Sequence, residues 1–306
     1  MKKTLVLIAV AVPTGIAVGA VDAVFGRVLL YLGAVRDAHT AWFLPFLGLI
    51  GALMAWAYKR YGAGCENGMG MVFEAGHAER EAIPLRLVPF VICATWLTHL
   101  FGGSAGREGV AVQLAAAPEW SAELALELTA LGIVFGLTGA AFAFCLKRAK
   151  KLAQNRLKNP VLRALVMGVA LSAVLYLLYR GRYCGLGTNL INASLAGEPI
   201  YAWDWALKLA LTVLTLSAGF QGGEVTPLFS IGASLGAALA GLLGLPAAFC
   251  AALGYAAVFG SATNTLLAPA LIGAEVFGWA AAPHFFAVCA LACAVNGGRS
   301  IYSGQK

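Results

Sequence analysis

Hydrophobic residues in this chain form long runs, separated by short polar or glycine-rich stretches. Runs of about 20 apolar residues are long enough to cross the hydrocarbon core of a bilayer as α-helices. A transmembrane β-barrel would show short segments of alternating hydrophobicity instead, and the sequence has no such segments. The pattern therefore predicts an all-α, polytopic membrane protein. The apolar runs are Leu5–Val35, Ala41–Tyr58, Leu85–Leu100, Ala130–Leu146, Leu162–Tyr179, Trp205–Gly219, Pro227–Leu245, Ala247–Phe277 and Phe285–Val295.

Composition supports a membrane protein and excludes an ordinary water-soluble domain. The 306 residues are 60% hydrophobic and 11% charged, and the mean hydropathy is +0.82. A soluble domain carries about 25% charged residues. The N-terminal stretch "MKKTLVLIAVAVPTGIAVGAVDA" also has features of a signal peptide. Because apolar residues resume at once with "VFGRVLLYLGAV", a first transmembrane helix is the favoured interpretation.

Basic residues are concentrated in a few places. The net charge is +7, and seven basic residues fall within 147–163. Lys2 and Lys3 begin the chain, and Lys59 and Arg60 end the second apolar run. The positive-inside rule places all three regions, and with them both termini, in the cytoplasm. Contact with anionic lipid is compatible with that placement, and no nucleic-acid partner is expected.

Cysteines and histidines give no indication of a metal or cofactor. Most of the seven cysteines lie in apolar runs, where we expect small buried apolar side chains. None forms a CxxC pair, and the four histidines are scattered without ligand spacing. The residues are Cys65, Cys93, Cys145, Cys184, Cys250, Cys289 and Cys293, and His39, His77, His99 and His284.

The two halves of the chain follow the same order of apolar and glycine-rich segments. "CENGMGMVFEAG" and "GGSAGREGVAVQL" in the first half correspond to "CGLGTNLINASLAG" and "GGEVTPLFSIGASLG" in the second. The basic segment 147–163 and the loop Arg36–Thr40 occupy matching places but opposite sides, so the halves are inverted. Inverted repeats are typical of transporters with a site at the bilayer midplane.

The repeats are unequal in length. We assign residues 1–117 to a truncated first repeat, 118–295 to the second repeat and 296–306 to a C-terminal segment. After its second glycine-rich break the second repeat continues through Ala237–Val295. The first repeat has no counterpart to this block between Leu114 and Ala122.

The glycine-rich breaks predict an anion site. Closely spaced glycines open a helix, and the exposed N–H groups of a helix N-terminus attract anions. Helix–helix packing is the alternative role for these small residues. The glycines concerned are Gly68, Gly70, Gly103, Gly106, Gly109, Gly222 and Gly223.

Two glutamates stand inside these breaks. A carboxylate at membrane depth costs several kcal/mol, so Glu108 in "GREG" calls for a functional reason. At a helix N-terminus it can occupy the anion's place and carry a proton, although a local ion pair with Arg107 is the alternative. Glu224 in "GGEVTP" is either a second such acid or a capping carboxylate.

Three motifs, "GGSAGREG", "GGEVTPLFSIGASLG" and "NGGRSIY", resemble the CLC family of chloride channels and anion/proton antiporters, and more closely its fluoride-exporting branch. The resemblance implies a CLC-like fold whose broken helices meet at midplane. It assigns the gating glutamate to Glu108 and the central tyrosine to Tyr302. It also puts Met69 where chloride-handling members have a serine. The implied anion-binding residues are Asn67, Gly68, Met69, Gly106, Arg107, Gly109, Val110, Val225, Thr226 and Tyr302.

The resemblance implies transport and not enzymatic activity. The expected function is fluoride/proton antiport that exports fluoride across a bacterial plasma membrane, without a cofactor. Alternatives are a CLC protein that handles chloride, as a channel or antiporter, or a truncated homologue that does not transport. The family forms homodimers through helices that include the missing block, so we expect a weaker dimer or a monomer here.

Overall fold

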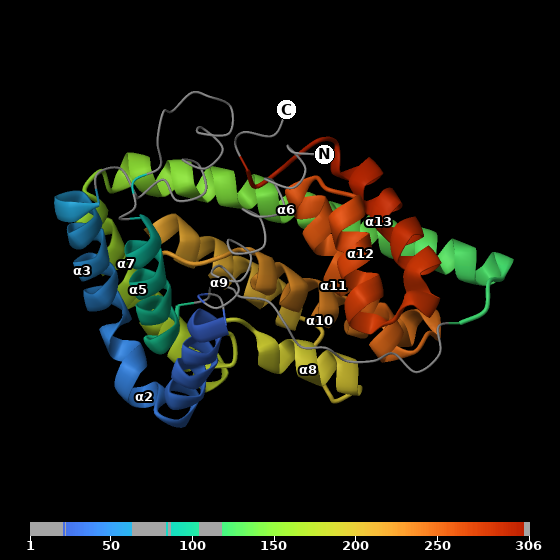
Figure 1. Cartoon of the computed structure of the whole chain (residues 1–306), viewed down its shortest axis with the longest axis horizontal. Coiled ribbons are helices and arrows are strands. Elements are labelled where there is room, and N and C mark those ends of the chain that lie inside the picture. Colours follow the sequence, from blue (N-terminus) through green and yellow to red (C-terminus); the bar gives the residue numbers. More distant parts are fainter. Residues whose placement is uncertain (1–20, 22, 63–83, 85–86, 104–117, 303–306) are drawn as a thin grey trace, which may run out of the picture.

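The computed structural model describes residues 21, 23–62, 84, 87–103 and 118–302 of the chain, and every regular element that they form is helical (Figure 1). Residues 23–38 are helical. The elements that follow are α2 (Thr40–Phe43), η1 (Leu44–Phe46), α3 (Leu47–Tyr61), α5 (Leu87–Leu100), α6 (Ala122–Arg156), α7 (Pro160–Leu177), η3 (Tyr179–Gly181), α8 (Thr188–Ala196), α9 (Asp204–Ala218), α10 (Val225–Leu243), α11 (Ala247–Thr263), α12 (Leu267–Phe277), η4 (Trp279–Ala281) and α13 (Ala282–Asn296).

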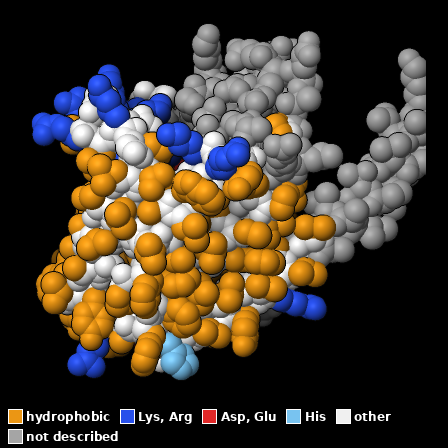
Figure 2. Space-filling view, turned by 90° about the vertical axis from the view of Figure 1, so that its left-hand side faces the viewer, with side chains coloured by type: hydrophobic (Ala, Val, Ile, Leu, Met, Phe, Trp, Pro, Cys, Tyr) orange, Lys and Arg blue, Asp and Glu red, His pale blue; other side chains and the backbone are white. Residues whose placement is uncertain are grey.

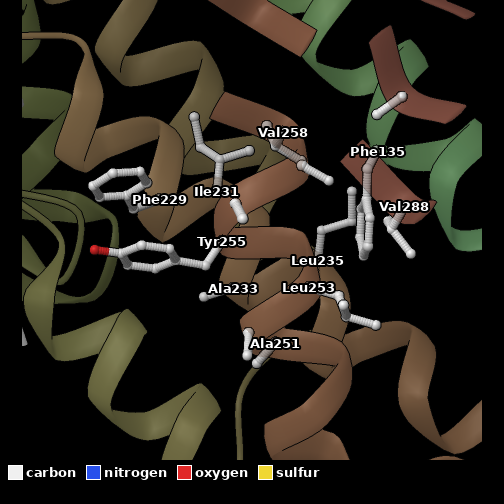
Figure 3. Packing of buried hydrophobic residues seen from close by; sticks show 14 of the residues in the cluster. Phe135, Phe229, Ile231, Ala233, Leu235, Ala251, Leu253, Tyr255, Val258 and Val288 are labelled. Carbon is white, nitrogen blue, oxygen red and sulfur yellow. The ribbon is translucent and has the colours of Figure 1, made fainter. Parts of the chain in front are cut away.

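The helices form two hydrophobic cores. The larger core lies where α6, α10, α11 and α13 pack together, and Phe135, Leu235 and Val288 lie within it (Figure 3). The smaller core joins α3, α7 and α9 through residues such as Leu47 and Leu175. Helix α9 contributes to both cores, because Leu216 faces the larger and Leu211 the smaller. The elements therefore form one connected body.

Helices α10 and α11 cross with their backbones nearly in contact. A Cβ atom on Gly232 would lie 2.0 Å from the carbonyl oxygen of Gly254, and one on Gly254 would lie 2.1 Å from that of Gly232. One turn along, a Cβ on Gly236 would lie 2.0 Å from the Cys250 oxygen. These pairs run in opposite directions along the chain, so the two helices are antiparallel. Small residues at such crossings are what membrane helices use in place of a hydrophobic driving force.

The outer surface suits a bilayer. Five helices are long and apolar enough to cross a membrane, and three shorter helices are also apolar. Figure 2 shows hydrophobic side chains covering the face on the side of α3 and α7, with most of the visible Lys and Arg at one end. Leu53 and Trp56 of α3 and Val169 of α7 are at least half exposed there. An apolar belt with charged ends is typical of a protein that spans a membrane.

Two predicted segment boundaries are corrected by the structure. The apolar run Ala130–Leu146 was expected to end before the basic segment 147–163, but α6 continues into that segment as far as Arg156. The helix is 35 residues long, which corresponds to about 52 Å and exceeds the thickness of the hydrocarbon core. The single apolar run Ala247–Phe277 is broken after Thr263, because Asn264 adopts a left-handed conformation with φ 54°.

Substitution of Gly232 tests the α10–α11 crossing. We expect Gly232→Ala to lower the free energy of unfolding by about 1–3 kcal/mol or more, because the new methyl group meets backbone that cannot move aside. Gly241→Ala is the matched control in the same helix, since nothing lies within 4 Å of its added Cβ. Thermal unfolding of both variants in detergent measures the difference, and equal melting temperatures would contradict the crossing.

Candidate functional site

The predicted site residues fall into two groups. Eight of them lie outside the described residues, namely Asn67, Gly68, Met69, Gly106, Arg107, Glu108, Gly109 and Val110. Glu224, Val225, Thr226 and Tyr302 are described. The described site residues therefore belong to the start of α10 and to the segment that follows α13.

Helix α10 begins at a half-buried position, separated by one residue from the glycine pair of "GGEVTP". Val225 is its first residue, and Glu224 holds the N-cap position. The N–H groups of a first helical turn have no intrahelical partner. Pro227 has no N–H, which leaves those of Val225 and Thr226 at the positive end of the helix. A negatively charged ligand is favoured at this point.

Two buried hydroxyl groups lie on one face of α10. Thr226 and Ser230 are four residues apart and completely enclosed. Among the described residues, neither Oγ1 of Thr226 nor Oγ of Ser230 has a hydrogen-bond partner. A buried hydroxyl without a partner costs about 1–3 kcal/mol, so such groups in a folded protein call for an explanation. A bound anion would accept a hydrogen bond from the Thr226 hydroxyl.

Glu224 does not cap α10. Its side chain makes no cap hydrogen bond, and Oε1 lies 3.9 Å from Nζ of Lys150 on α6. The capping alternative is therefore wrong, and the carboxylate faces a partly exposed cation. This partner could not be predicted, because Lys150 is one of seven basic residues in the segment 147–163 and nothing in the sequence distinguishes it from the others.

The antiparallel crossing carries the end of α11 to the start of α10. Gly232 pairs with Gly254 and Gly236 with Cys250, so continuing the same register backward along α10 brings residues 224–226 level with residues 260–262. The last four carbonyls of a helix normally lack partners. Here each carbonyl is satisfied: Gly260 by Thr265 N–H, Ser261 by Asn264 N–H, Ala262 by Ile301 N–H and Thr263 by the Ser300 hydroxyl.

Those last two hydrogen bonds attach the segment 299–302 to α11. Ile301 N lies 2.9 Å from Ala262 O, Ser300 Oγ lies 3.2 Å from Thr263 O and Tyr302 N lies 3.1 Å from Ser300 Oγ. The segment thus brings the backbone of Tyr302 to the same end of the larger core as the start of α10.

A tight turn directs the segment back toward α11. Gly297 and Gly298 both have positive φ, 67° and 72°, which only glycine adopts without strain. The side-chain amide of Asn296 donates a hydrogen bond to Arg299 O across the turn. The "NGG" sequence is a strong turn signal, so this element was open to prediction, although Asn296 was not among the predicted residues.

Comparisons with known proteins identify the family to which the chain belongs. The family model for voltage-gated chloride channels matches residues 50–119 and 117–297. The chain belongs to the CLC family. A "Chloride/fluoride channel protein" of Pseudomonas syringae pv. tomato (strain ATCC BAA-871 / DC3000) is 29% identical over 381 aligned positions, which cover 94% of this CLC chain and 83% of the relative.

Two solved structures share the fold. The crystal structure of a CLC-type fluoride/proton antiporter matches with a TM-score of 0.92 and 39% sequence identity, over 94% of each chain. A slow cyanobacterial Cl⁻/H⁺ antiporter matches with a TM-score of 0.76 and 14% identity, over 92% of each chain. The second likeness concerns the fold alone. The predicted CLC-like fold is confirmed.

The matches also bear on the length of the first repeat. The alignment with the Pseudomonas relative has 381 positions, whereas this CLC protein has 306 residues, so the relative contains residues that this chain lacks. The two stretches of the family match meet at residues 117–119. That junction coincides with the place of the expected missing block.

Loss of the Asn296 amide tests how Tyr302 is positioned. We expect Asn296→Ala to speed hydrogen exchange at the Ile301 amide about fivefold, because a typical hydrogen bond contributes about 1 kcal/mol. Asn189→Ala is the matched control, since its amide donates to a backbone oxygen, that of Arg182, in an exposed setting. Hydrogen–deuterium exchange with single-residue resolution over 296–302 provides the measurement. Unchanged exchange in Asn296→Ala would mean that the turn is held by other contacts.

Proposed function

We propose that this CLC protein exports fluoride from the cytoplasm in exchange for protons. The observation that carries the proposal is the hydroxyl of Thr226 in the first turn of α10, which is completely buried and has no hydrogen-bond partner among the described residues. Fluoride is small and strongly hydrated, so a site that replaces its water needs donors that are held in place and make short, strong hydrogen bonds. The 39% identity to a CLC-type fluoride/proton antiporter over 94% of the chain supports the choice of ion.

In this proposal the first turn of α10 and the segment 299–302 form one wall of the anion site. The N–H groups of Val225 and Thr226 and the Thr226 hydroxyl donate to fluoride, and Tyr302 lies next to it along the path. The donors contributed by the first repeat are Asn67, Gly68, Met69, Gly106, Arg107, Gly109 and Val110. No lysine side chain is needed, and a site made mainly of backbone N–H and hydroxyl donors releases its ion more readily.

Glu108 carries the proton in the proposed cycle. As a carboxylate it occupies the anion's place between helix ends, and as a neutral acid it leaves that place free for fluoride. The exchange of one anion for another at a single position couples the two ions. Glu224, held near Lys150, is a second acid on the cytoplasmic side of the same path.

Chloride transport is the alternative that the comparisons favour next, because the Pseudomonas relative is named for both ions. Efflux of fluoride and of chloride from proteoliposomes, with proton movement recorded in parallel, decides between them. Fluoride efflux that exceeds chloride efflux and drives protons supports the proposal. Fluoride efflux without proton movement would identify a channel.

We further propose that the protein lies in the bacterial plasma membrane with both termini in the cytoplasm. The ends of α3 and α6 that carry Lys59, Arg60 and the basic residues from Lys147 onward lie on the same side of the molecule (Figure 1), in keeping with the positive-inside rule. The division into a truncated first repeat, a second repeat and a C-terminal segment belongs to the same proposal. We also propose that the protein forms a weaker dimer than relatives that have a full first repeat.

Thr226→Val tests the anion donor. The substitution keeps the shape of the side chain and removes the hydroxyl, and we expect fluoride efflux to fall about tenfold or more, because a hydrogen bond to a charged group contributes roughly 1.5–3 kcal/mol. Thr215→Val is the matched control, since that buried hydroxyl is already satisfied 2.7 Å from Leu211 O. Thr226→Ser should retain most activity. Equal efflux from the two valine variants would remove Thr226 from the site.

Glu108→Gln tests proton coupling. The amide can neither ionise nor carry a proton, so we expect proton movement driven by a fluoride gradient to be lost while the protein stays folded. Glu198→Gln, at an exposed position after α8, should leave it unchanged. Parallel fluoride-electrode and pH recordings on proteoliposomes provide the measurement. Normal proton movement in Glu108→Gln would mean that this glutamate is structural.

A further inference from the structure

A basic pocket lies beside α6, on the side where the helix emerges from the apolar belt. Its volume is about 300 Å³. Among the described residues, two elements line it: one face of α6, and the start of the segment 299–302. The lining residues are Ala143, Phe144, Lys147, Arg148, Lys151, Arg299 and Ser300.

The positive charge in this pocket is not balanced by the part of the chain that the structure describes. Four of the lining residues are cationic, and none of them takes part in an ion pair with a described residue. The nearby carboxylate of Glu224 faces Lys150, which does not line the pocket. Arg299 donates one hydrogen bond, to Asn296 O at 3.2 Å, and its guanidinium has further donors to offer. Such a pocket is complementary to a phosphate group.

An exposed apolar stripe leads along α6 to the pocket. At about 100° per residue, Ile133, Leu137 and Phe144 share one helix face with Arg148 and Lys151. The three apolar side chains are between 41% and 56% exposed. These three residues lie along the membrane-spanning part of α6, and the basic residues begin about one turn after Phe144. An acyl chain along the stripe would therefore have its head group at the cations.

We propose that this pocket binds the phosphate head group of an acidic phospholipid from the cytoplasmic leaflet, with its acyl chains against the stripe. A soluble phosphate would use the cations alone, whereas a lipid uses both the cations and the apolar face below them. Anionic lipids of that leaflet are attracted by clustered basic residues near the membrane surface.

Bound lipid would also act on the segment that carries Tyr302. Ser300 lines the pocket, and its hydroxyl lies 3.2 Å from Thr263 O and 3.1 Å from the Tyr302 amide nitrogen. A head group held by Arg148, Lys151 and Arg299 would contact the outer side of the segment 299–302. The lipid thus steadies the attachment of residues 300 and 301 to the end of α11.

Lipid titration of two double variants tests the proposal. Phosphatidylglycerol is added to the purified full chain in detergent, and native mass spectrometry measures its affinity, with phosphatidylcholine for comparison. We expect Arg148→Gln/Lys151→Gln to bind phosphatidylglycerol about tenfold or more weakly, because each basic residue near an anionic head group adds to binding. Arg156→Gln/Lys158→Gln removes the same charge from exposed positions outside the pocket, and its affinity should match that of the unmodified protein.

A second readout links the lipid to the segment. Phosphatidylglycerol should slow hydrogen exchange at the Ile301 amide of the unmodified protein and leave that of Arg148→Gln/Lys151→Gln unchanged. Three outcomes would overturn the proposal. Equal loss of affinity in both double variants would indicate general surface charge. Displacement of the lipid by equimolar inorganic phosphate would identify a soluble-anion site. Equal binding of phosphatidylcholine would mean that the head-group charge is irrelevant.

Discussion

The backbone contact between α10 and α11 is the constraint on which the rest of the structure depends. Because Gly232 and Gly254 leave no room for a side chain, the two helices lie in one antiparallel register, and that register brings the last turn of α11 level with the first turn of α10. The aromatic rings of Phe229 and Tyr255, with centroids 3.8 Å apart, continue the same contact toward the site (Figure 3). A shift of either helix would separate the positive start of α10 from the segment that carries Tyr302.

Buried helix ends need their polar groups satisfied, and this requirement explains the geometry of the site. At the end of α11 the left-handed Asn264, the following Thr265 and the segment 299–302 together supply donors to all four final carbonyls, so the negative end of this helix is neutralised by short-range hydrogen bonds. The start of α10 is left different: its first N–H groups have no intrahelical partner, and the Thr226 hydroxyl has none among the described residues. The unsatisfied donor end lies beside a neutralised carbonyl end, and it is there that we propose the anion binds.

Sequence patterns predicted which segments form helices better than they predicted where those helices end. Hydrophobic runs indicated most of the described helices because membrane-spanning segments depend on length and apolarity alone. The break at Asn264 was missed, since apolar residues continue on both sides and the break depends on one left-handed residue. The glycine-rich break in "GGEVTP" indicated a helix N-terminus near this place, because closely spaced glycines open a helix, and α10 begins there at Val225. The contact of Glu224 with Lys150 was beyond prediction, as it depends on how α6 crosses α10.

Helix α6 connects the features that sequence reasoning treated separately. Its middle packs in the larger core, where Ser261 of α11 donates to Gly136 O at 2.7 Å. Three to four turns later Lys150 faces Glu224, and neighbouring residues line the basic pocket beside Ser300. One continuous helix therefore contacts α11, the acid at the start of α10 and the segment before Tyr302. A charge bound in the pocket would therefore lie at the same end of this 35-residue helix as Lys150, and beside Ser300. The helix continues past Leu146, where the apolar run ends, and this continuation brings Lys150 to Glu224 and the pocket cations to Ser300.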